Sequence, residues 1–218
     1  MIYPIGGGFV RLVDSMGSDM SVVRAAQVSY GNETKGETAD QKLIHYLMEH
    51  HHGTPFEHVV LTFHIRCPMF VARQWFRHRI GSFNEISGRY TELDTDFFVP
   101  ETWRQNKTDN HQASVEGDFS EAGIDKMVRE WNYTTDIIRS TYESLLEQGV
   151  AREQARAILP MGTYTEFYWT VNLRSLFNFI RLRNAPDAQS EMREYAEVVQ
   201  TIAEEAAPWC FEAFNKYK

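Results

Sequence analysis

The chain has 218 residues, of which 43% are hydrophobic, and a formal net charge of -8 at pH 7. This length favours one domain with a sizeable core, and the composition is that of a globular protein rather than a disordered one. The acidic balance argues against a nucleic-acid-binding surface, unless basic side chains gather in a local cleft.

Arginine supplies most of the positive charge. The chain has 16 Arg against 6 Lys, and five of the arginines lie between Arg66 and Arg89. The planar guanidinium group makes bidentate contacts with phosphate and carboxylate, whereas lysine acts as a point charge. The cluster therefore indicates an anion-binding site, and the alternative is a solvated face.

Neither the cysteines nor the hydropathy points to an extracellular or membrane protein. Cys67 and Cys210 are far apart in the sequence, so they suggest neither a disulfide framework nor a zinc site. We expect both to be small buried residues rather than nucleophiles. The first ten residues lack the pattern of a signal peptide, and no run approaches about 18 apolar residues. We expect a soluble cytoplasmic protein.

The N-terminal part of the chain predicts a strand followed by two helices. Residues 9–13 predict a short strand, and Asp19 and Ser21 are candidate caps of a helix that extends to about Val28. A second helix is predicted for residues 38–50, and Gly and Pro shortly after it end that helix. Its expected apolar face consists of Leu43, Tyr46 and Leu47.

The clearest strand pattern follows at residues 57–67, where Val59, Leu61, Phe63, Ile65 and Cys67 alternate with more polar side chains. Pro68 then opens a helix predicted for residues 68–79, because proline fits the first turn. Residues 101–120 are polar and predict a long loop, which in a compact domain is often functional.

The remaining chain predicts four helices and one more strand. A long helix is expected at 121–147, ended by Gly149, and a short one from about Ala151 to Pro160. An alternating strand at 162–172 leads into a helix that ends at Arg183, and a last helix runs from Asp187 to the C-terminus. Strands separated by helices of unequal length predict an α+β fold, with residues 1–218 as a single domain around a central, mostly antiparallel sheet flanked by helices.

The arginine cluster sits at the C-terminal end of the helix predicted for residues 68–79. Arg73 and Arg77 are four residues apart, and like charges at this spacing cost an isolated helix roughly 0.2–0.5 kcal/mol. No acidic residue lies between Pro68 and Asn84 to offset them. The helix dipole could stabilise one of these cations, so an anionic ligand is expected for the others.

The sequence "SGRY" follows this cluster. Ser87 and Gly88 can bring backbone N–H groups to a phosphate, and Arg89 can add a charged hydrogen bond. Ser87 is a weaker candidate for a nucleophile, because the Gly-x-Ser-x-Gly elbow is absent.

These motifs resemble the flavin-dependent thymidylate synthases. The signature of that family is Arg-His-Arg, seven residues and then Ser, which occurs here from Arg77 to Ser87. The wider stretch "FVARQWFRHRIGSFNEISGRY" is similar to the family almost throughout, and "TPFEH", "AREQARAILP" and "TVNLRSLFNFIRLR" match it in the same order. The similarity covers nearly the whole chain, with residues 101–120 and the two ends matching least.

The resemblance implies an activity, a set of cofactors and an assembly. The family makes dTMP from dUMP, with 5,10-methylenetetrahydrofolate as the carbon donor, NADPH as the reductant and FAD as the relay between them. It implies a homotetramer whose active sites are shared between subunits. No Gly-x-Gly-x-x-Gly fingerprint occurs, so FAD is not expected to bind as in a Rossmann fold.

The resemblance also implies how the uracil ring is activated. The family does not use a cysteine nucleophile, which agrees with the surroundings of Cys67 and Cys210 in this sequence. A fixed cation near N3 and O4 of the uracil would instead make C5 more nucleophilic. By position, this cation is Arg183, which the resemblance makes the catalytic residue. The alternative is a helix arginine placed favourably for the dipole.

Further site residues are implied by position, and no metal site is expected. The run His50–His52 leaves open which histidine approaches the flavin. The residues implied for dUMP are Gln74, Arg77, Glu85, Ile86, Ser87, Gly88, Arg89, Arg156 and Arg183. The residues implied for FAD are His52, Thr54, Arg77, His78, Arg79, Glu85, Asn172, Arg174 and Asn178.

Two functions of other classes compete with this interpretation. A nucleic-acid-binding module could use the arginines with Trp75 and Phe76 for phosphates and stacking, but the net charge and the lack of a known motif disfavour it. A metal-dependent nucleotide hydrolase could use His50–His52 with Glu57 and His58, but no His-Glu-x-x-His pattern occurs. Bound flavin distinguishes the enzyme from both alternatives.

Overall fold

The computed structural model describes residues 1–31, 36–106 and 114–218 and is built on a five-stranded sheet. The strand order is β1-β2-β3-β7-β4, and every neighbouring pair is antiparallel, which confirms the α+β prediction. The strands are β1 (Ile2–Ile5), β2 (Gly8–Met16), β3 (Val60–Pro68), β4 (Ser82–Glu85) and β7 (Tyr164–Asn172), and β5 (Arg104–Asn106) pairs with β6 (Ser114–Glu116) in a separate hairpin.

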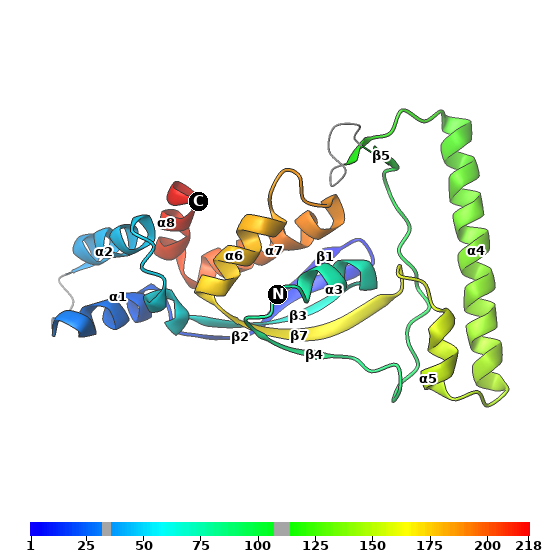
Figure 1. Ribbon diagram of the computed structural model, residues 1–218, viewed down its shortest axis with the longest axis horizontal. Coiled ribbons are helices and arrows are strands. Elements are labelled where there is room, and N and C mark those ends of the chain that lie inside the picture. The colour runs from blue at the N-terminus through cyan, green and yellow to red at the C-terminus, as the bar shows by residue number, and fades with distance from the viewer. Residues whose placement is uncertain (32–35, 107–113) are drawn as a thin grey trace.

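Helices α3, α6 and α7 lie on one side of the sheet, as Figure 1 shows. Helices α1, α2 and α8 gather at one end, and α4 and α5 at the other. The α-helices are α1 (Asp19–Gln27), α2 (Glu37–Glu49), α3 (Met69–Trp75), α4 (Glu121–Glu147), α5 (Arg152–Ala155), α6 (Leu173–Arg183), α7 (Ser190–Ala206) and α8 (Pro208–Tyr217). Short 3-10 helices are η1 (Val28–Tyr30), η2 (Thr54–His58) and η3 (Arg156–Ile158).

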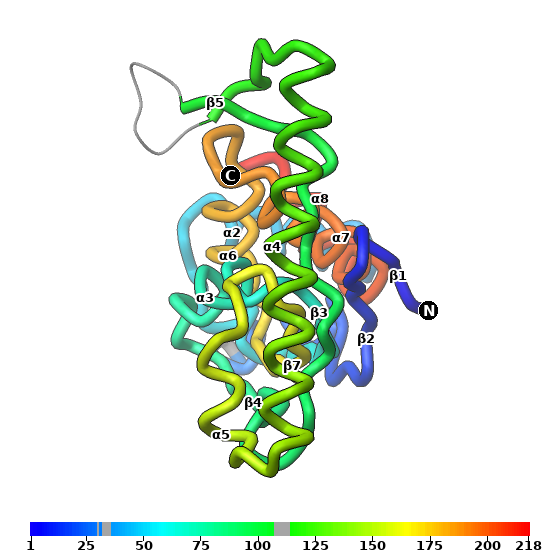
Figure 2. The backbone as a smooth tube through the Cα atoms, turned by 90° about the vertical axis from the view of Figure 1, so that its right-hand side faces the viewer, coloured from blue at the N-terminus to red at the C-terminus, as the bar shows by residue number. Residues whose placement is uncertain are grey.

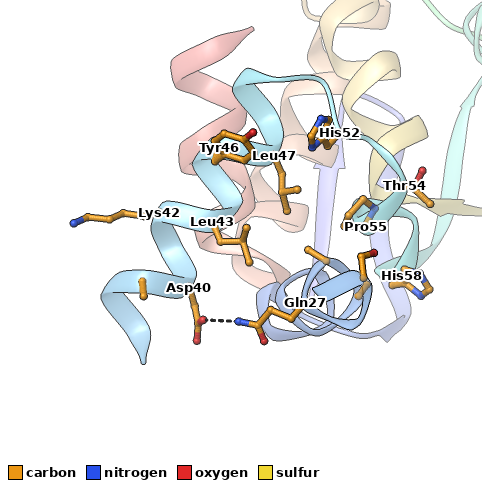
Figure 3. Close-up of a pocket in the computed structure, with 14 residues that line it drawn as sticks. Gln27, Asp40, Lys42, Leu43, Tyr46, Leu47, His52, Thr54, Pro55 and His58 are labelled. Atoms are coloured by element: carbon orange, nitrogen blue, oxygen red, sulfur yellow. Dashed lines mark hydrogen bonds between the residues drawn. The ribbon is translucent and has the colours of Figure 1, made fainter. Parts of the chain in front are cut away.

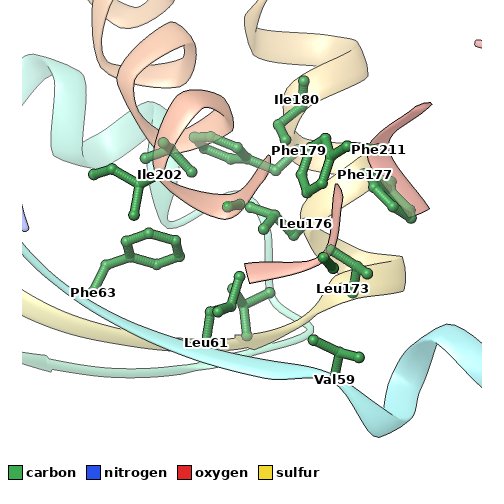
Figure 4. Packing of buried hydrophobic residues seen from close by; sticks show 14 of the residues in the cluster. Val59, Leu61, Phe63, Leu173, Leu176, Phe177, Phe179, Ile180, Ile202 and Phe211 are labelled. Atoms are coloured by element: carbon green, nitrogen blue, oxygen red, sulfur yellow. The ribbon is translucent and has the colours of Figure 1, made fainter. Parts of the chain in front are cut away.

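The core forms where β3 and β7 face α6. Alternate residues of β3 are fully buried, from Leu61 to Cys67, as the period-two pattern predicts. Figure 4 shows this face of β3 packed against Leu176 and other apolar residues of α6, with Ile202 of α7 alongside. Each fully buried leucine or phenylalanine contributes roughly 1.5–3 kcal/mol, so this contact fixes α6 firmly on the sheet.

Asp19 has a different role from the expected one. The N-cap of α1 is Ser18, and a capping box links it to Ser21. The Asp19 carboxylate is buried and accepts hydrogen bonds from the backbone N–H groups of Trp209 and Cys210, at 3.2 and 2.9 Å. It therefore caps the first turn of α8, which anchors the C-terminal helix to the N-terminal one.

Several predicted boundaries were wrong. The helix predicted for residues 68–79 ends at Trp75, so the Arg77–Arg79 motif lies in the connection to β4 and the repulsion expected along a helix does not arise there. The last helix is two helices, because Pro208 cannot continue α7. Residues 101–120 include the β5–β6 hairpin, and their part from 107 to 113 lies outside the described residues.

The long helix α4 stands apart from the core. Figures 1 and 2 show it along one end of the molecule, with α5 beside it. Tyr142 is its only buried residue, whereas Ile124, Tyr133 and Ile137 are exposed. Gly149, at φ +82°, ends this segment as predicted. The exposed apolar residues of α4 are a candidate surface for contact with another molecule.

No described helix combines the length and the apolar character needed to cross a bilayer.

Candidate functional site

A cavity of about 800 Å³ opens where α2 ends and α6 passes the connection from α3 to β4. In the part of the chain that the structure describes, five arginines line it, and Glu57 is the one carboxylate among its lining residues. Apolar side chains such as Met48, Ile80 and Leu182 form the rest of the wall. Such a mixture suits a ligand with a flat apolar ring and an anionic group. The arginines are Arg77, Arg79, Arg174, Arg181 and Arg183.

Helix α6 supplies a large part of this wall because its two faces differ. Asn172 caps the helix by accepting a hydrogen bond from the N–H of Ser175 at 2.9 Å. The apolar stripe that includes Leu176 and Ile180 is buried, and the opposite face presents Arg174 and Asn178 to the cavity. The core contact with β3 therefore fixes the direction of the polar face.

Arg183, the last residue of α6, is held by two uncharged acceptors. Its Nε donates to Nε2 of His78 at 2.9 Å, and its Nη2 donates to the backbone carbonyl of Gln74 at 3.1 Å. Among the described residues, Arg183 has no carboxylate partner. Its charge is thus oriented but not neutralised.

The protonation state of His78 is part of this arrangement. Burial and the positive charge of Arg183 lower the pKa of His78 from its ordinary value of 6.5 to about 4. The imidazole is therefore neutral at neutral pH, and the lone pair on Nε2 accepts the hydrogen bond from Arg183. A protonated His78 would lose this bond and add a second cation.

The surroundings of the Arg183 guanidinium disfavour its positive charge. Burial and the positive charge of Arg77 lower the pKa of Arg183 from its ordinary value. It stays protonated at neutral pH, since arginine does not deprotonate in proteins. Arg174 differs, because it pairs with Glu57 at 2.5 Å and packs on Gly53, where any Cβ would lie 2.6 Å from its Nε. Arg174 and Arg183 therefore have separate partners.

A second cavity, of about 670 Å³, lies between α1, α2 and η2. Figure 3 shows Tyr46, Leu47 and Thr54 around it, with Gln27 hydrogen-bonded to Asp40 at 3.3 Å. Of the predicted apolar face of α2, Leu47 is buried and Leu43 packs partly buried against the core, whereas Tyr46 is half exposed and lines this cavity. Ile44 is buried as well. The two cavities share Leu47 and His52, so an elongated ligand could extend from one into the other.

The phosphate-binding residues expected from the sequence form a separate group. A Cβ on Gly88 would lie 3.1 Å from Cδ of Arg156, so these two residues are in contact. Arg89 pairs with Glu153 of α5 at 3.1 Å, and Glu85 accepts a hydrogen bond from Thr165 at 2.7 Å. None of the residues 85–89 or Arg156 lines either cavity. Within one chain the expected site is therefore divided into two halves.

The structure thus sorts the expected site residues. The large cavity is lined by His52, Arg77, His78, Arg79, Asn172, Arg174, Asn178 and Arg183, and Thr54 lines the smaller one. Gln74 touches the first group only through its carbonyl, and Glu85, Ile86, Ser87, Gly88, Arg89 and Arg156 belong to the second.

Several residues that line the large cavity were not identified from the sequence, among them Arg181. Arg181 lines the large cavity, and its place three residues after Asn178 on the same helix face was the available signal. In the histidine run, His51 and His52 line this cavity, whereas His50 stacks on Tyr46.

The two cysteines are buried and free, as predicted. Burial and the negative charge of Glu85 raise the pKa of the Cys67 thiol, and burial and Asp19 raise the pKa of Cys210. Both therefore remain thiols at neutral pH. Within the described ranges, no three His, Cys, Asp or Glu side chains gather in a way that could hold a metal ion.

Comparison with known proteins identifies the family. A family model described as "Thymidylate synthase complementing protein" matches residues 11–209. The chain belongs to the flavin-dependent thymidylate synthase family. A flavin-dependent thymidylate synthase of Thermosipho africanus is 51% identical over 217 residues, covering 96% of this chain and 92% of that protein. One from Thermus thermophilus is 49% identical over 212 residues, covering 96% of this chain and 76% of that protein.

Solved structures of a similar enzyme have the same fold as this chain. The UMP/dUMP methylase PolB from Streptomyces cacaoi, bound with 5-Br dUMP, superposes with a TM-score of 0.87 and 37% identity. The superposition covers 96% of this chain and 95% of that chain. The same enzyme bound with 5-Br UMP gives a TM-score of 0.88.

The lowered pKa of His78 predicts a specific pH dependence of stability. Between pH of about 4 and 6.5 the unfolded chain binds a proton at this residue that the folded chain does not, so the free energy of unfolding falls as the pH falls through this window. Above pH 6.5 the residue has no effect. The substitution His78→Gln should flatten this part of the curve, measured by urea unfolding from pH 4 to 8. A wild-type slope in the variant would contradict the assignment.

Proposed function

We propose that residues 1–218 form one flavin-dependent thymidylate synthase domain that methylates dUMP to dTMP for dTTP synthesis. The carbon comes from 5,10-methylenetetrahydrofolate and the reducing equivalents from NADPH through FAD. Support comes from the family and from the relatives of that name. The observation that carries the proposal is the oriented, uncompensated charge of Arg183 beside a cationic cavity.

Arg183 provides the means to activate a uracil ring. Its guanidinium is partly desolvated, which strengthens its interaction with any negative charge that develops nearby. Facing N3 and O4 of the base, it would stabilise the anionic form of the ring and make C5 nucleophilic. No thiolate is needed for this step, and both cysteines are buried thiols.

The large cavity fits FAD. Arg77, Arg79 and Arg181 supply charge for a diphosphate, and Phe177 with Leu182 supplies apolar surface for a ring system. We propose His52, Thr54, Arg77, His78, Arg79, Asn172, Arg174 and Asn178 as its contacts, with Glu85 from the other half of the site. When bound, FAD accepts and donates hydride, which is chemistry that no side chain here supplies.

The second group of residues fits the phosphate of dUMP. Ser87 and Gly88 offer backbone donors, and Arg89 and Arg156 offer charge. Arg156 has no ion-pair partner among the described residues, so its charge is available. We propose that these four residues bind the phosphate, and that Gln74, Arg77, Glu85, Ile86 and Arg183 complete the nucleotide site.

We propose that the two halves of the site meet in a homotetramer. Figure 1 shows α5 and α2 at opposite ends of the molecule. Helix α5 neighbours the proposed phosphate-binding residues, and α2 borders the cavities. The exposed apolar residues of α4 offer a surface for another subunit. A cytoplasmic location is part of the same proposal.

The competing functions have less support. A nucleic-acid-binding module would expose its arginines along a groove, whereas the arginines here line a cavity that aromatic and apolar side chains also wall. The three histidines of the run do not point to one place, since His51 and His52 line the cavity whereas His50 stacks on Tyr46. Neither alternative explains the similarity to the family over nearly the whole chain.

Anaerobic spectroscopy tests the activity. The purified protein with FAD should show a flavin spectrum that bleaches on addition of NADPH, and bleaching should be faster with dUMP present. Adding 5,10-methylenetetrahydrofolate should then give dTMP. Removal of one preorganised charge costs about 10²–10³ in rate, so Arg183→Ala should lower dTMP formation by at least that factor.

The matched control is Arg193→Ala. Arg193 lies on α7, pairs with Glu197 and lines neither cavity, so this variant should form dTMP at the wild-type rate. A colourless protein that takes up no added FAD would exclude the flavoenzyme. Full dTMP formation by Arg183→Ala would exclude its catalytic role.

Mixed subunits test the shared site. Arg183→Ala and Arg89→Ala should each be inactive alone, because each removes one half of every site. Coexpressed, they should regain part of the wild-type activity, since a site that combines Arg183 of one subunit with Arg89 of another contains no substitution. An inactive mixture, with size-exclusion chromatography showing mixed tetramers, would place both halves of each site in the same chain.

A further inference from the structure

A continuous chain of hydrogen bonds connects the β5–β6 hairpin with Gln74. Arg104 of β5 donates from Nη2 to both carboxylate oxygens of Glu191, at 2.5 and 2.7 Å. Gln189 donates from Nε2 to Oε2 of Glu191 at 2.9 Å, and Gln74 donates from Nε2 to Oε1 of Gln189 at 2.5 Å. These hydrogen bonds thus join three segments that are distant in the sequence. We call this chain of hydrogen bonds the amide relay.

The amide relay has a fixed direction. A carboxylate only accepts hydrogen bonds, so the NH₂ group of Gln189 must face Glu191 and its carbonyl oxygen must face Gln74. Gln74 must then present its own NH₂ group to Gln189. Turning the Gln189 amide over would set two oxygens and two NH₂ groups against each other and lose both hydrogen bonds. Turning the Gln74 amide over would set its oxygen against that of Gln189 and lose the one hydrogen bond between them.

Glu191 stays ionised despite its environment. Burial alone would raise the pKa of its carboxyl group, but the hydrogen bonds from Arg104, from its own backbone N–H and from Gln189 outweigh burial and lower it. The Glu191 side chain is 14% exposed and that of Arg104 is 23% exposed, so the pair is shielded from water. Arg104 of the hairpin thereby keeps Glu191 ionised, and an ionised carboxylate can only accept hydrogen bonds.

The fixed direction determines what the Gln74 side chain can bind. Within the described residues its side chain makes no other hydrogen bond, which leaves the carbonyl oxygen and the second N–H. Next to each other, uracil offers an acceptor at O4 and a donor at N3–H, whereas cytosine offers a donor at N4 and an acceptor at N3. In a given pose of the base, an amide that cannot turn over forms hydrogen bonds with one of these two donor–acceptor patterns. Against the other pattern it places donor on donor and acceptor on acceptor.

We propose that Gln189 and Glu191 are positioning residues that hold the Gln74 amide in the orientation that accepts a uracil base and rejects cytosine. The proposal rests on the proposed function, because it takes the ligand to be a pyrimidine nucleotide held by Gln74. The backbone carbonyl of Gln74 holds the guanidinium of Arg183, so this residue lies beside the cavity that Arg183 lines. The hairpin residue Arg104 fixes the charge at the far end.

The first test replaces the fixed acceptor by an adjustable one. In Glu191→Gln the volume is kept, but a carboxamide can accept or donate, so the amide relay can reverse. The affinities of the FAD-loaded protein for dUMP and dCMP are measured by isothermal titration calorimetry. The wild type should prefer dUMP, and in the variant the ratio of the two affinities should fall about tenfold, the effect of losing one hydrogen bond of typical strength.

A second variant and a control separate positioning from folding. Gln189→Met keeps the side-chain length but removes the connecting amide, and it should lower the ratio by a similar factor. Glu194→Gln lies one helical turn beyond Glu191 and outside the amide relay, and it should keep the wild-type ratio. Melting temperature and bound FAD report whether each variant folds, so a fall in the ratio is interpreted only for folded protein.

Two results would overturn the proposal in distinguishable ways. If both Glu191→Gln and Gln189→Met weaken dUMP and dCMP by the same factor, or weaken neither, the amide relay has only a structural role. A wild-type protein that binds FAD and dUMP while its variants keep the full preference refutes the amide relay alone. A wild-type protein that binds neither FAD nor dUMP refutes the proposed function, and the amide relay loses its ligand with it.

Discussion

No carboxylate among the described residues pairs with Arg183, and its positive charge is the constraint on which the site depends. A carboxylate at hydrogen-bonding distance would neutralise the guanidinium and leave little field for a ligand. The structure supplies instead the neutral imidazole of His78 and a backbone carbonyl, which fix the geometry and keep the charge. The lowered pKa of His78 is a consequence of this arrangement, since burial and the adjacent cation both favour the neutral ring.

The fold holds this charge in place through apolar packing. Strand β7 leads directly into α6, Asn172 caps the junction, and the buried stripe of α6 rests on β3. Because the helix cannot rotate without exposing Phe177 and its buried neighbours, the polar face stays directed at the cavity. The same chain leaves the residues around Arg89 and Arg156 at a distance from the cavity, which makes assembly part of the proposed chemistry.

The spacing of apolar residues and the residues that end helices predicted much of this fold from the sequence. The alternation in β3 and β7 is a local pattern, and the structure confirms it. The end of α3 at Trp75 was not predicted, because residues 76–79 contain no glycine or proline and their departure from the helix depends on contacts such as that of His78 with Arg183. The capping of α8 by Asp19 joins residues 190 positions apart, and no local pattern reveals it. The candidate site residues were named from motifs and stay a prediction, whereas their division into two groups required the structure.

The most direct test of the account is the protonation of the bound base. Nitrogen-15 NMR of dUMP labelled at N3 reports when the N3 proton is lost, for the free nucleotide and for the nucleotide bound to the protein. If the unpaired charge of Arg183 polarises the uracil, the bound nucleotide should lose this proton at a lower pH than the free one, and Arg183→Gln should abolish the difference. An unchanged N3 titration on the wild-type protein, or the same shift in both proteins, would contradict the account.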